Sequence, residues 1–406
     1  MAAGGEDLLH GVVVVGGGIC GLATALALHR KGIRSLVLER AESLRATGAG
    51  ISIQVNGWRA LDQLKVGDEL RKLAMPLAGM DKREIHGGRA TAVSYRTESR
   101  CLKRSDLLEM LAKNLPAGSI RYGCQVEAIY LEPFTRFPVV SISDGTTIKA
   151  KIVIGCDGSN SVVAKFLGLK SVKYLPMWAA RGFTVYPEGH NCGNRFQQLI
   201  GDRTNIRIIP IDNKAVNFTA IMSQPPKECV NNRDVGLIQQ VTLQALEGFP
   251  KEIIDLVRHC DTASLSFTQL CYRAPWHMVL EPFQEGTVTV AGDAMHVMGP
   301  FIGQGGSCGL EDAVVLARCL SKTMPEEGVD EVGDDDWKLR KSRVEEGLRL
   351  YVKERRWRIV MLSLQSFLAG LVVVASSGIK KVLVAYVMAV LFKDKYRHTN
   401  YDCGSL

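Results

Sequence analysis

Glycines and carboxylates that follow apolar runs are the residues of this chain with the clearest chemical meaning. Gly16, Gly18 and Gly21 form a G-x-G-x-x-G pattern directly after the apolar run 12–15. In such a loop the first glycine permits a tight turn, the second lets a pyrophosphate approach the backbone, and the third lets a helix pack against the strand. Glu39 ends the next apolar run, where a carboxylate can accept from a ribose 2′-hydroxyl and disfavours a 2′-phosphate. The pattern predicts a dinucleotide site and leaves FAD and NAD both open.

A second carboxylate lies in the run 152–168, where an apolar segment ends in Asp157-Gly158 and a Ser/Asn-rich turn follows. Asp157 is placed to organise this loop near a pyrophosphate. The same position also suits an N-cap or an Asx-turn, so a purely structural role stays open.

A third pattern covers 288–318, where Asp293 follows an apolar run and Gly303, Gly305 and Gly306 follow it. A carboxylate at a strand end can accept from ribityl hydroxyls, and glycines let the backbone lie against a flat ring. A helix that begins near Ser307 would direct its positive end at the flavin N1–C2 carbonyl edge and stabilise the reduced anion. This pattern favours FAD over NAD.

The elements that must position these residues follow from hydrophobic periodicity. Residues 12–40 read as a βαβ unit. Helices are predicted over 56–74, 103–115, 253–260 and 311–322, and strands over 120–129, 137–143, 146–154, 287–294 and within 172–222. The acidic stretch 326–336 reads as an exposed loop or a helix lead-in.

Taken together, GGGICG with Glu39, then CDGSNS, then AGDAMH…GPFIGQGG resemble single-component FAD-dependent monooxygenases. This is the class of para-hydroxybenzoate hydroxylase, salicylate hydroxylase and zeaxanthin epoxidase, and the chain is similar to its plant members over nearly its whole length. The resemblance implies an α/β fold: a doubly wound, Rossmann-like FAD-binding domain with an inserted mixed β-sheet substrate domain. The expected ranges are 1–75, 101–171 and 283–325 for the FAD domain, 76–100 and 172–282 for the sheet domain, and 326–406 for a C-terminal helical region.

The resemblance also implies a reaction. NADH or NADPH reduces the flavin and leaves, O2 adds to the flavin C4a carbon, and the hydroperoxide gives one oxygen atom to a small aromatic or alkene substrate. The alternative is an FAD-binding protein of the same fold with lost or altered oxygenase activity, regulatory or dehydrogenase-like.

By motif position, Arg104 resembles the arginine that reaches FAD, although a surface charge at a helix start would look the same. Arg45 matches a position near the cofactor, Val126 the residue whose backbone touches adenine, and Pro300 the proline beside the flavin ring. The complete set of predicted cofactor contacts is Gly16, Gly18, Ile19, Gly21, Glu39, Arg40, Arg45, Arg104, Val126, Asp157, Asp293, Pro300, Gly303, Gly305 and Gly306.

The loop before GQG departs from the family pattern, because Gly299 and Phe301 stand where the family has a threonine and an acid. We expect Phe301 either to favour a more hydrophobic substrate or to blunt turnover. No catalytic residue is firmly assigned, and the candidates are His296, Pro300 and Phe301; packing is favoured over acid–base work for His296. Arg181, Phe183 and Phe218 are candidates to line a substrate pocket, or are ordinary sheet residues.

Composition narrows the function classes. The chain has 406 residues and a formal charge of +8, without the aromatic-interleaved basic stripe of a nucleic-acid binder. Its 11 cysteines show no zinc-type spacing, so no metal site is predicted, and reduced thiols favour an intracellular, cytoplasmic setting. The acidic start MAAGGEDLLHG lacks an apolar core, so we expect no signal or transit peptide.

The segment 365–392 carries two apolar runs broken by SSGIKK, each shorter than the ~20 residues that a spanning helix needs. A helical hairpin packed on the FAD domain is one interpretation. A peripheral membrane contact, helped by nearby basic residues, is the other. Those basic residues are Arg355, Arg356, Arg358, Lys380 and Lys381. Oligomeric state is not predicted.

Overall fold

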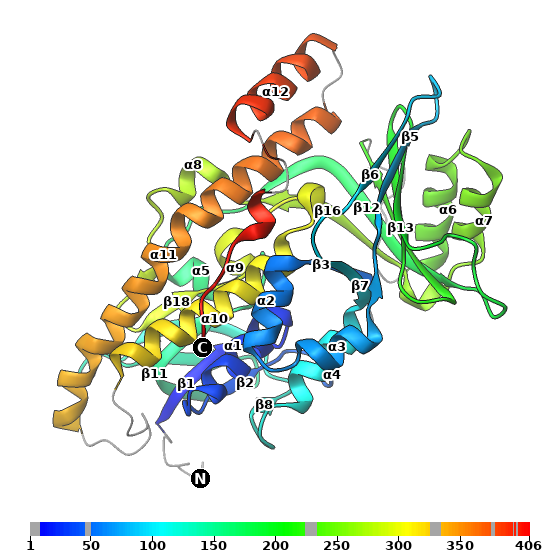
Figure 1. Cartoon of the computed structure of the whole chain (residues 1–406). Coiled ribbons are helices and arrows are strands. Elements are labelled where there is room, and N and C mark those ends of the chain that lie inside the picture. The colour runs from blue at the N-terminus through cyan, green and yellow to red at the C-terminus, as the bar shows by residue number, and fades with distance from the viewer. Residues whose placement is uncertain are drawn as a thin grey trace.

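Most of the chain folds around two β-sheets that stand side by side (Figure 1). The computed structural model describes residues 9–44, 50–223, 234–324, 334–374, 378–392, 394 and 397–406. Arg45 and most of the stretch 326–336 lie outside these residues, so the roles predicted for them stay predictions.

The first sheet has five parallel strands in the order β18-β11-β1-β2-β8, with β17 antiparallel at one edge. From β1 the chain first builds outward to β2 and β8, then returns to the other side of β1 with β11 and β18. The strand order therefore reverses at β1, and ligands of doubly wound folds bind outside the carboxyl ends of the strands at such a point. The strands on this path are β1 (His10–Val15), β2 (Leu36–Leu38), β8 (Ile120–Arg121), β11 (Thr147–Gly155), β17 (Gln284–Glu285) and β18 (Val288–Val290). Off this path, β10 (Pro138–Ile142) pairs antiparallel with β11 and with β9 (Val126–Leu131).

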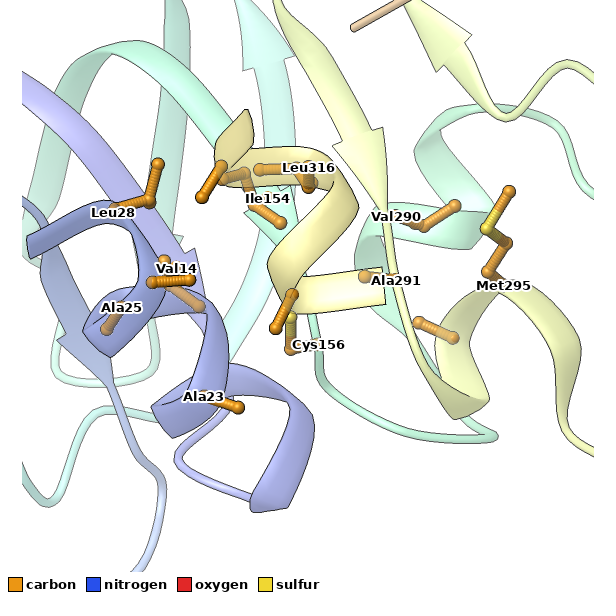
Figure 2. Packing of buried hydrophobic residues seen from close by; sticks show 14 of the residues in the cluster. Val14, Ala23, Ala25, Leu28, Ile154, Cys156, Val290, Ala291, Met295 and Leu316 are labelled. Atoms are coloured by element: carbon orange, nitrogen blue, oxygen red, sulfur yellow. The ribbon is translucent and has the colours of Figure 1, made fainter. Parts of the chain in front are cut away.

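The strands of this parallel sheet are buried in one large apolar core, which explains their continuous apolar runs. Val12 to Val15 are almost completely buried, and α1 (Ile19–Arg30) and α10 (Gly305–Thr323) pack close to them. Figure 2 shows Ala23 and Ala25 of α1, Val14 of β1 and Leu316 in this core. Small side chains on α1 permit the short distance between helix and sheet.

The second sheet is mixed, with the order β16-β12-β15-β14-β13-β5-β6 and one parallel pair, β13 with β5. Helices α6 (Val235–Ala245) and α7 (Lys251–Arg258) cover one of its faces, at the right of Figure 1. The other face turns toward the first sheet. Its strands are β5 (Gly79–Glu84), β6 (Ala90–Ser94), β12 (Lys173–Val185), β13 (Arg195–Ile200), β14 (Thr204–Pro210), β15 (Ala215–Met222) and β16 (Ser266–Tyr272).

Short elements join the two sheets. A three-stranded sheet is made by β3 (Gly50–Gln54), β7 (Ser99–Lys103) and β4 (Met75–Pro76). The helix predicted over 56–74 is two helices, since Lys65 adopts a left-handed φ of 60° between them. The remaining short helices are α2 (Val55–Gln63), α3 (Gly67–Leu73), α4 (Arg104–Lys113), α5 (Val162–Phe166), α8 (Pro275–Met278) and α9 (Asp293–His296).

Two helices complete the chain. The long helix α11 (Asp334–Val374) packs along α10, and α12 (Gly378–Leu391) folds back beside its far end (Figure 1). The predicted fold class is confirmed: a doubly wound α/β domain, an inserted mixed sheet and a helical C-terminal region. The predicted sequence boundaries of the domains stay predictions.

Candidate functional site

A cavity of about 750 Å³ opens at the carboxyl ends of β1 and β11 and continues to the uncovered face of the second sheet. Its lining includes Gly16 to Ile19 after β1, Asp157 after β11, Asp293 after β18 and Arg181 on β12. This is the place where the strand order of the first sheet reverses. The volume lies within the range of small-molecule and cofactor sites.

The glycine loop after β1 is shaped by contacts that leave no room for side chains. A Cβ on Gly16, which has φ 104°, would lie 2.5 Å from the Cys156 carbonyl oxygen. A Cβ on Gly21 would lie 1.9 Å from the Gly16 carbonyl oxygen, whereas one on Gly18 would meet nothing within 4 Å. Gly16 and Gly21 therefore hold the loop and helix together, and Gly18 leaves the backbone open toward the cavity. These are the geometric roles that the spacing predicts.

Glu39 follows β2 and links the glycine loop to the cavity. Its two carboxylate oxygens accept from the backbone nitrogens of Gly17, at 2.7 Å, and Ala41, at 2.9 Å. Glu39 also lines the cavity, where a carboxylate can accept a hydrogen bond from a ribose hydroxyl. The bond to Gly17 is a structural role that the sequence reasoning did not assign.

Asp157 supports the start of α5, whose N-cap is Ser161, and lines the cavity as well. Its carboxylate accepts from Ser161 Oγ at 2.6 Å and from the Val162 nitrogen at 2.7 Å. Burial raises the pKa of Asp157, although these hydrogen bonds oppose the shift. The N-cap of α5 is Ser161 and not Asp157, so the structural role of Asp157 is to hold the cap residue and the loop beside Gly16.

Asp293 and the start of α10 form the opposite wall. Asp293 lines the cavity, and burial raises its pKa, while the charges of His296 and Arg104 lower it. Helix α10 begins at Gly305, two residues earlier than predicted, and Gly303 before it has φ 64°. Its free amides and the positive end of its dipole therefore meet the cavity next to a carboxylate.

Most other predicted cofactor contacts line the same cavity. These are Ile19, Arg40, Arg104, Val126, Pro300, Gly303, Gly305 and Gly306. Gly21 acts from behind the lining, through the contact with Gly16 described above.

The second sheet presents two arginines to the cavity. Arg181 on β12 and Arg207 on β14 both line it, beside Phe196, Ile209 and Thr219. Arg207 Nη1 donates to the Pro300 carbonyl oxygen at 2.7 Å, and Arg181 Nη1 donates to Thr268 Oγ1 at 2.7 Å. Burial and repulsion from Arg181 lower the pKa of Arg207 to about 10, and burial lowers that of Arg181.

Sequence reasoning missed Arg207, and strand periodicity would have supported it. Side chains alternate between the two faces of a sheet, so Arg207 and Ile209 share one face of β14. Arg181 pairs with Thr219 in the ladder between β12 and β15, and both point to the cavity. The lining that this sheet contributes within the described residues contains no carboxylate to balance the two guanidinium groups.

The same alternation corrects the other two pocket candidates. Phe218 lies on the opposite face of β15, fully buried in the core under α6 and α7, and so does not line the pocket. Phe183 lies on the cavity side of β12, but it packs against the small cluster that contains Ile211 and Ala215 and is not part of the lining.

His296 is not part of the lining either. It is fully buried, and its Nε2 lies 2.5 Å from Asp312 Oδ2 on α10. Although burial opposes the imidazolium, Cys308 and Asp312 raise the pKa of His296, and His296 and Arg355 hold the pKa of Asp312 well below its usual range despite burial. The packing role favoured for His296 fits this arrangement, because it pairs with a carboxylate behind the cavity.

Arg355 of α11 completes this buried network. Its Nε donates to Asp312 Oδ1 at 2.7 Å and its Nη2 lies 2.7 Å from Glu311 Oε2. His296, Cys308 and Asp312 offer ligand atoms within 4.8 Å of one another, in the manner of a metal site. The guanidinium, however, also approaches Cys308 Sγ to 3.2 Å, so an arginine brings positive charge to the place where a metal ion would supply it.

Phe301 points away from the cavity, which corrects its predicted place at the meeting of substrate and flavin. A Cβ on Gly299 would lie 2.4 Å from its ring and a Cβ on Gly370 of α11 would lie 2.6 Å from it. Ser366 Oγ, one turn earlier on α11, donates to the Gly299 carbonyl oxygen at 2.7 Å. Gly299, Phe301 and Gly370 thus form a matched contact that fixes the loop to the long helix.

The residues present fit FAD. The glycine loop and Glu39 suit an ADP half, Asp293 suits the ribityl chain, and the glycines before α10 suit a flat ring. A Cβ on Gly18 would enter the open cradle, as expected where a pyrophosphate approaches the backbone.

Comparisons with known proteins agree with this fit. The family model described as an FAD binding domain matches residues 10–349. Monooxygenase 1 of Arabidopsis thaliana is 43% identical over 399 residues, which cover 98% of this chain and 99% of that protein. Monooxygenase 2 of the same plant is 36% identical over 405 residues, covering 97% and 98%.

Solved structures share the fold. HpxO of Klebsiella pneumoniae complexed with FAD and uric acid superposes with a TM-score of 0.76 at 21% identity, over 98% of both chains. A salicylate hydroxylase substrate complex gives a TM-score of 0.69 at 21% identity, over 99% of both chains. From its family match and its plant relatives, this chain belongs to the FAD-binding monooxygenases of the aromatic hydroxylase type, and FAD is its cofactor.

Proposed function

We propose that this enzyme uses NADH or NADPH and O2 to add one oxygen atom to a small, electron-rich substrate, an aromatic ring or an alkene, that carries a negative charge. The observation that carries the proposal is that one continuous cavity is lined by both the FAD cradle and the side chains of Arg181 and Arg207. When bound, FAD supplies the acceptance of hydride and the activation of oxygen.

The substrate end of the cavity combines apolar walls with two cations. Phe196, Ile209 and Met298 supply apolar surface for a ring or a hydrocarbon. Arg207 Nε is buried and has no hydrogen-bond partner among the described residues, so this donor is available to a ligand. An anionic group placed between the two arginines would satisfy that donor and offset their mutual repulsion. On the basis of Phe301, the sequence alone predicts a hydrophobic substrate. The proposed substrate has an apolar part and one anionic group.

Two relatives support this substrate class. One is HpxO complexed with FAD and uric acid, and the other is a salicylate hydroxylase substrate complex. An acidic substrate of this kind would suit the two arginines and the apolar walls of this chain.

The chain's own residues position the partners of the reaction. The amides at the start of α10 would stabilise negative charge on a bound flavin, and Arg207 holds the Pro300 carbonyl in the loop that lines the cavity. The alternative of an FAD protein without oxygenase activity rests on Gly299 and Phe301, which differ from the family pattern. Their packing on Gly370 gives this difference from the family a structural reason.

The experiment is a turnover assay with labelled oxygen on the purified, flavin-loaded protein. A panel of hydroxybenzoates and their neutral amides is tested with NADH and NADPH, and flavin reduction is followed first without oxygen. We expect reduction by at least one nicotinamide, stimulation by an acid, and one labelled oxygen atom in the product. Reduction without any oxygenated product from the panel or from a plant extract would refute the oxygenase, and equal rates with acids and amides would refute the anionic substrate.

A further inference from the structure

Helix α12 presents an apolar surface that nothing in the described structure covers. Val382, Leu383 and Tyr386 are 71%, 61% and 67% exposed, and Val390 and Leu391 are both 52% exposed. Val382, Tyr386 and Val390 follow one another at intervals of four residues and so share one face of the helix. A surface helix of a globular protein normally turns charged residues to water. Figure 1 shows α12 at the far end of α11, away from the two sheets.

In the sequence, basic residues flank this apolar segment on both sides. Residues 382–392 contain no charged side chain. Lys380 and Lys381 precede them in the sequence, and Lys393, Lys395 and Arg397 follow, with Asp394 as the single acid between 378 and 397. Uncharged apolar residues between basic flanks match the boundary between acyl chains and anionic headgroups.

Charge also argues against a second copy of this chain as the occupant. Two copies that joined through α12 would bring the same basic flanks together, and the whole chain already carries a net charge of +8. An anionic lipid surface is complementary to these flanks, whereas another α12 is not.

The geometry indicates contact with one leaflet and not a crossing. Helix α12 has 14 residues, fewer than the ~20 needed to span a bilayer. Within α11, Arg340–Val373 is long and apolar enough to cross a membrane by length and composition alone. Its inner face, however, packs against α10 and carries the buried Arg355, paired with Asp312 and Glu311, so α11 is a core helix of the fold.

We propose that α12 is a membrane-docking helix that lays the face formed by Val382, Tyr386 and Val390 on an anionic bilayer. Helix α11 links α12 to the reaction site, because Ser366 and Gly370 of α11 contact the loop of Gly299 and Phe301. Docking would therefore hold the substrate end of the enzyme close to the lipid surface. The proposal concerns a surface outside the cavity and stands independently of the proposed oxygenase.

The test is co-sedimentation of the flavin-loaded full chain with vesicles of phosphatidylcholine alone or mixed with phosphatidylserine. We expect the chain to sediment with the mixed vesicles and to stay in solution with the neutral ones. The double variant Val382→Glu/Tyr386→Glu should reduce the bound fraction at least tenfold. Lys380→Glu/Lys381→Glu should remove the preference for phosphatidylserine.

A matched control comes from Phe134, which is 94% exposed in the loop between β9 and β10. Phe134→Glu removes an exposed aromatic far from α12 in the sequence and should bind vesicles like the unmodified chain. Flavin content and circular dichroism establish that each variant is folded. In addition, Tyr386→Trp should give a blue shift of tryptophan emission on the mixed vesicles.

Three results would overturn the proposal. The first is no sedimentation of the unmodified chain with either vesicle. The second is unchanged sedimentation of Val382→Glu/Tyr386→Glu. The third is a stable dimer of the unmodified chain that this double variant converts to a monomer, which would assign the surface to a second copy.

Discussion

The two ends of the cavity are built from different parts of the polypeptide. At the cofactor end the site is formed mainly by the backbone. It consists of glycines at positions where a Cβ would lie as close as 1.9 Å to a neighbouring atom, and of the free amides of α10. At the substrate end the second sheet supplies side chains, chiefly Arg181 and Arg207, at alternating strand positions. Backbone geometry is hard to change without losing the fold, whereas side chains on a rigid sheet can vary. This difference explains how one cofactor fold can accept many substrates.

The cofactor end is broken most completely by Gly21→Val. The new Cβ would lie 1.9 Å from the Gly16 carbonyl oxygen, so α1 has to move away from β1. We expect the purified variant to contain no bound FAD, as measured by visible flavin absorbance. Gly18→Ala is the matched control, because its Cβ meets no protein atom within 4 Å. It should keep the stability of the apoprotein and weaken FAD binding roughly tenfold, about 1.4 kcal/mol. Normal flavin content in Gly21→Val would contradict this account of the loop.

The buried pair of His296 and Asp312 lies behind the cofactor end of the cavity. The variant His296→Gln tests this pair, because it removes the cation next to Asp312. Breaking a buried ion pair costs roughly 3 kcal/mol of the free energy of unfolding. Because the pKa of His296 is raised in the folded state, its contribution is fully present below about pH 6.5 and is lost as pH rises through the folded-state pKa.

Urea unfolding of both proteins between about pH 5.5 and about pH 9 measures this dependence. The difference between His296→Gln and the unmodified chain should be largest at the acidic end. A difference that is constant or grows with pH would show that the pair with Asp312 is not ionic.

The substrate end is broken by Arg207→Gln, which leaves the glycine loop untouched. Loss of a charge-assisted hydrogen bond of about 2 kcal/mol predicts a roughly 30-fold rise in KM for an acidic substrate. FAD affinity should change less than KM, since the glycine loop is untouched and Arg207 meets the cofactor end only through the Pro300 carbonyl. Arg207→Lys is the control and should recover part of the loss. Weaker FAD binding with an unchanged KM would assign Arg207 to the cofactor instead.

The connection between the two ends is tested by Phe301→Asp, for which we expect the smallest effect. The substitution places a carboxylate against Gly299 and Gly370, where the ring now packs. We expect the loop to loosen and the yield of product per NAD(P)H oxidised to fall by a few fold, about 1 kcal/mol. Phe301→Leu should retain the yield. Unchanged kinetics in Phe301→Asp would show that this contact does not influence the reaction.

The contrast between the two ends also explains what could be predicted from the sequence. The glycine loop, Glu39 and Asp293 are local patterns, in which a few neighbouring residues carry the whole signal, and the structure places all of them at one cavity. Arg207 and Phe218 depend on which face of a strand meets the cavity, and that is set by distant strands. Phe301 was misplaced because its partner, Gly370, lies on a helix that the sequence did not relate to the loop.

The central claim is that one cavity joins the FAD cradle to an anion-binding face. It is tested most directly by titrating the flavin-loaded protein with salicylate and with neutral salicylamide, using the change in flavin absorbance to obtain Kd. The account predicts that the acid binds at least roughly tenfold more tightly than the amide, about 1.4 kcal/mol, and that Arg207→Gln brings the two Kd values together. Equal binding of acid and amide by the unmodified protein, or a preference that survives in Arg207→Gln, would contradict it.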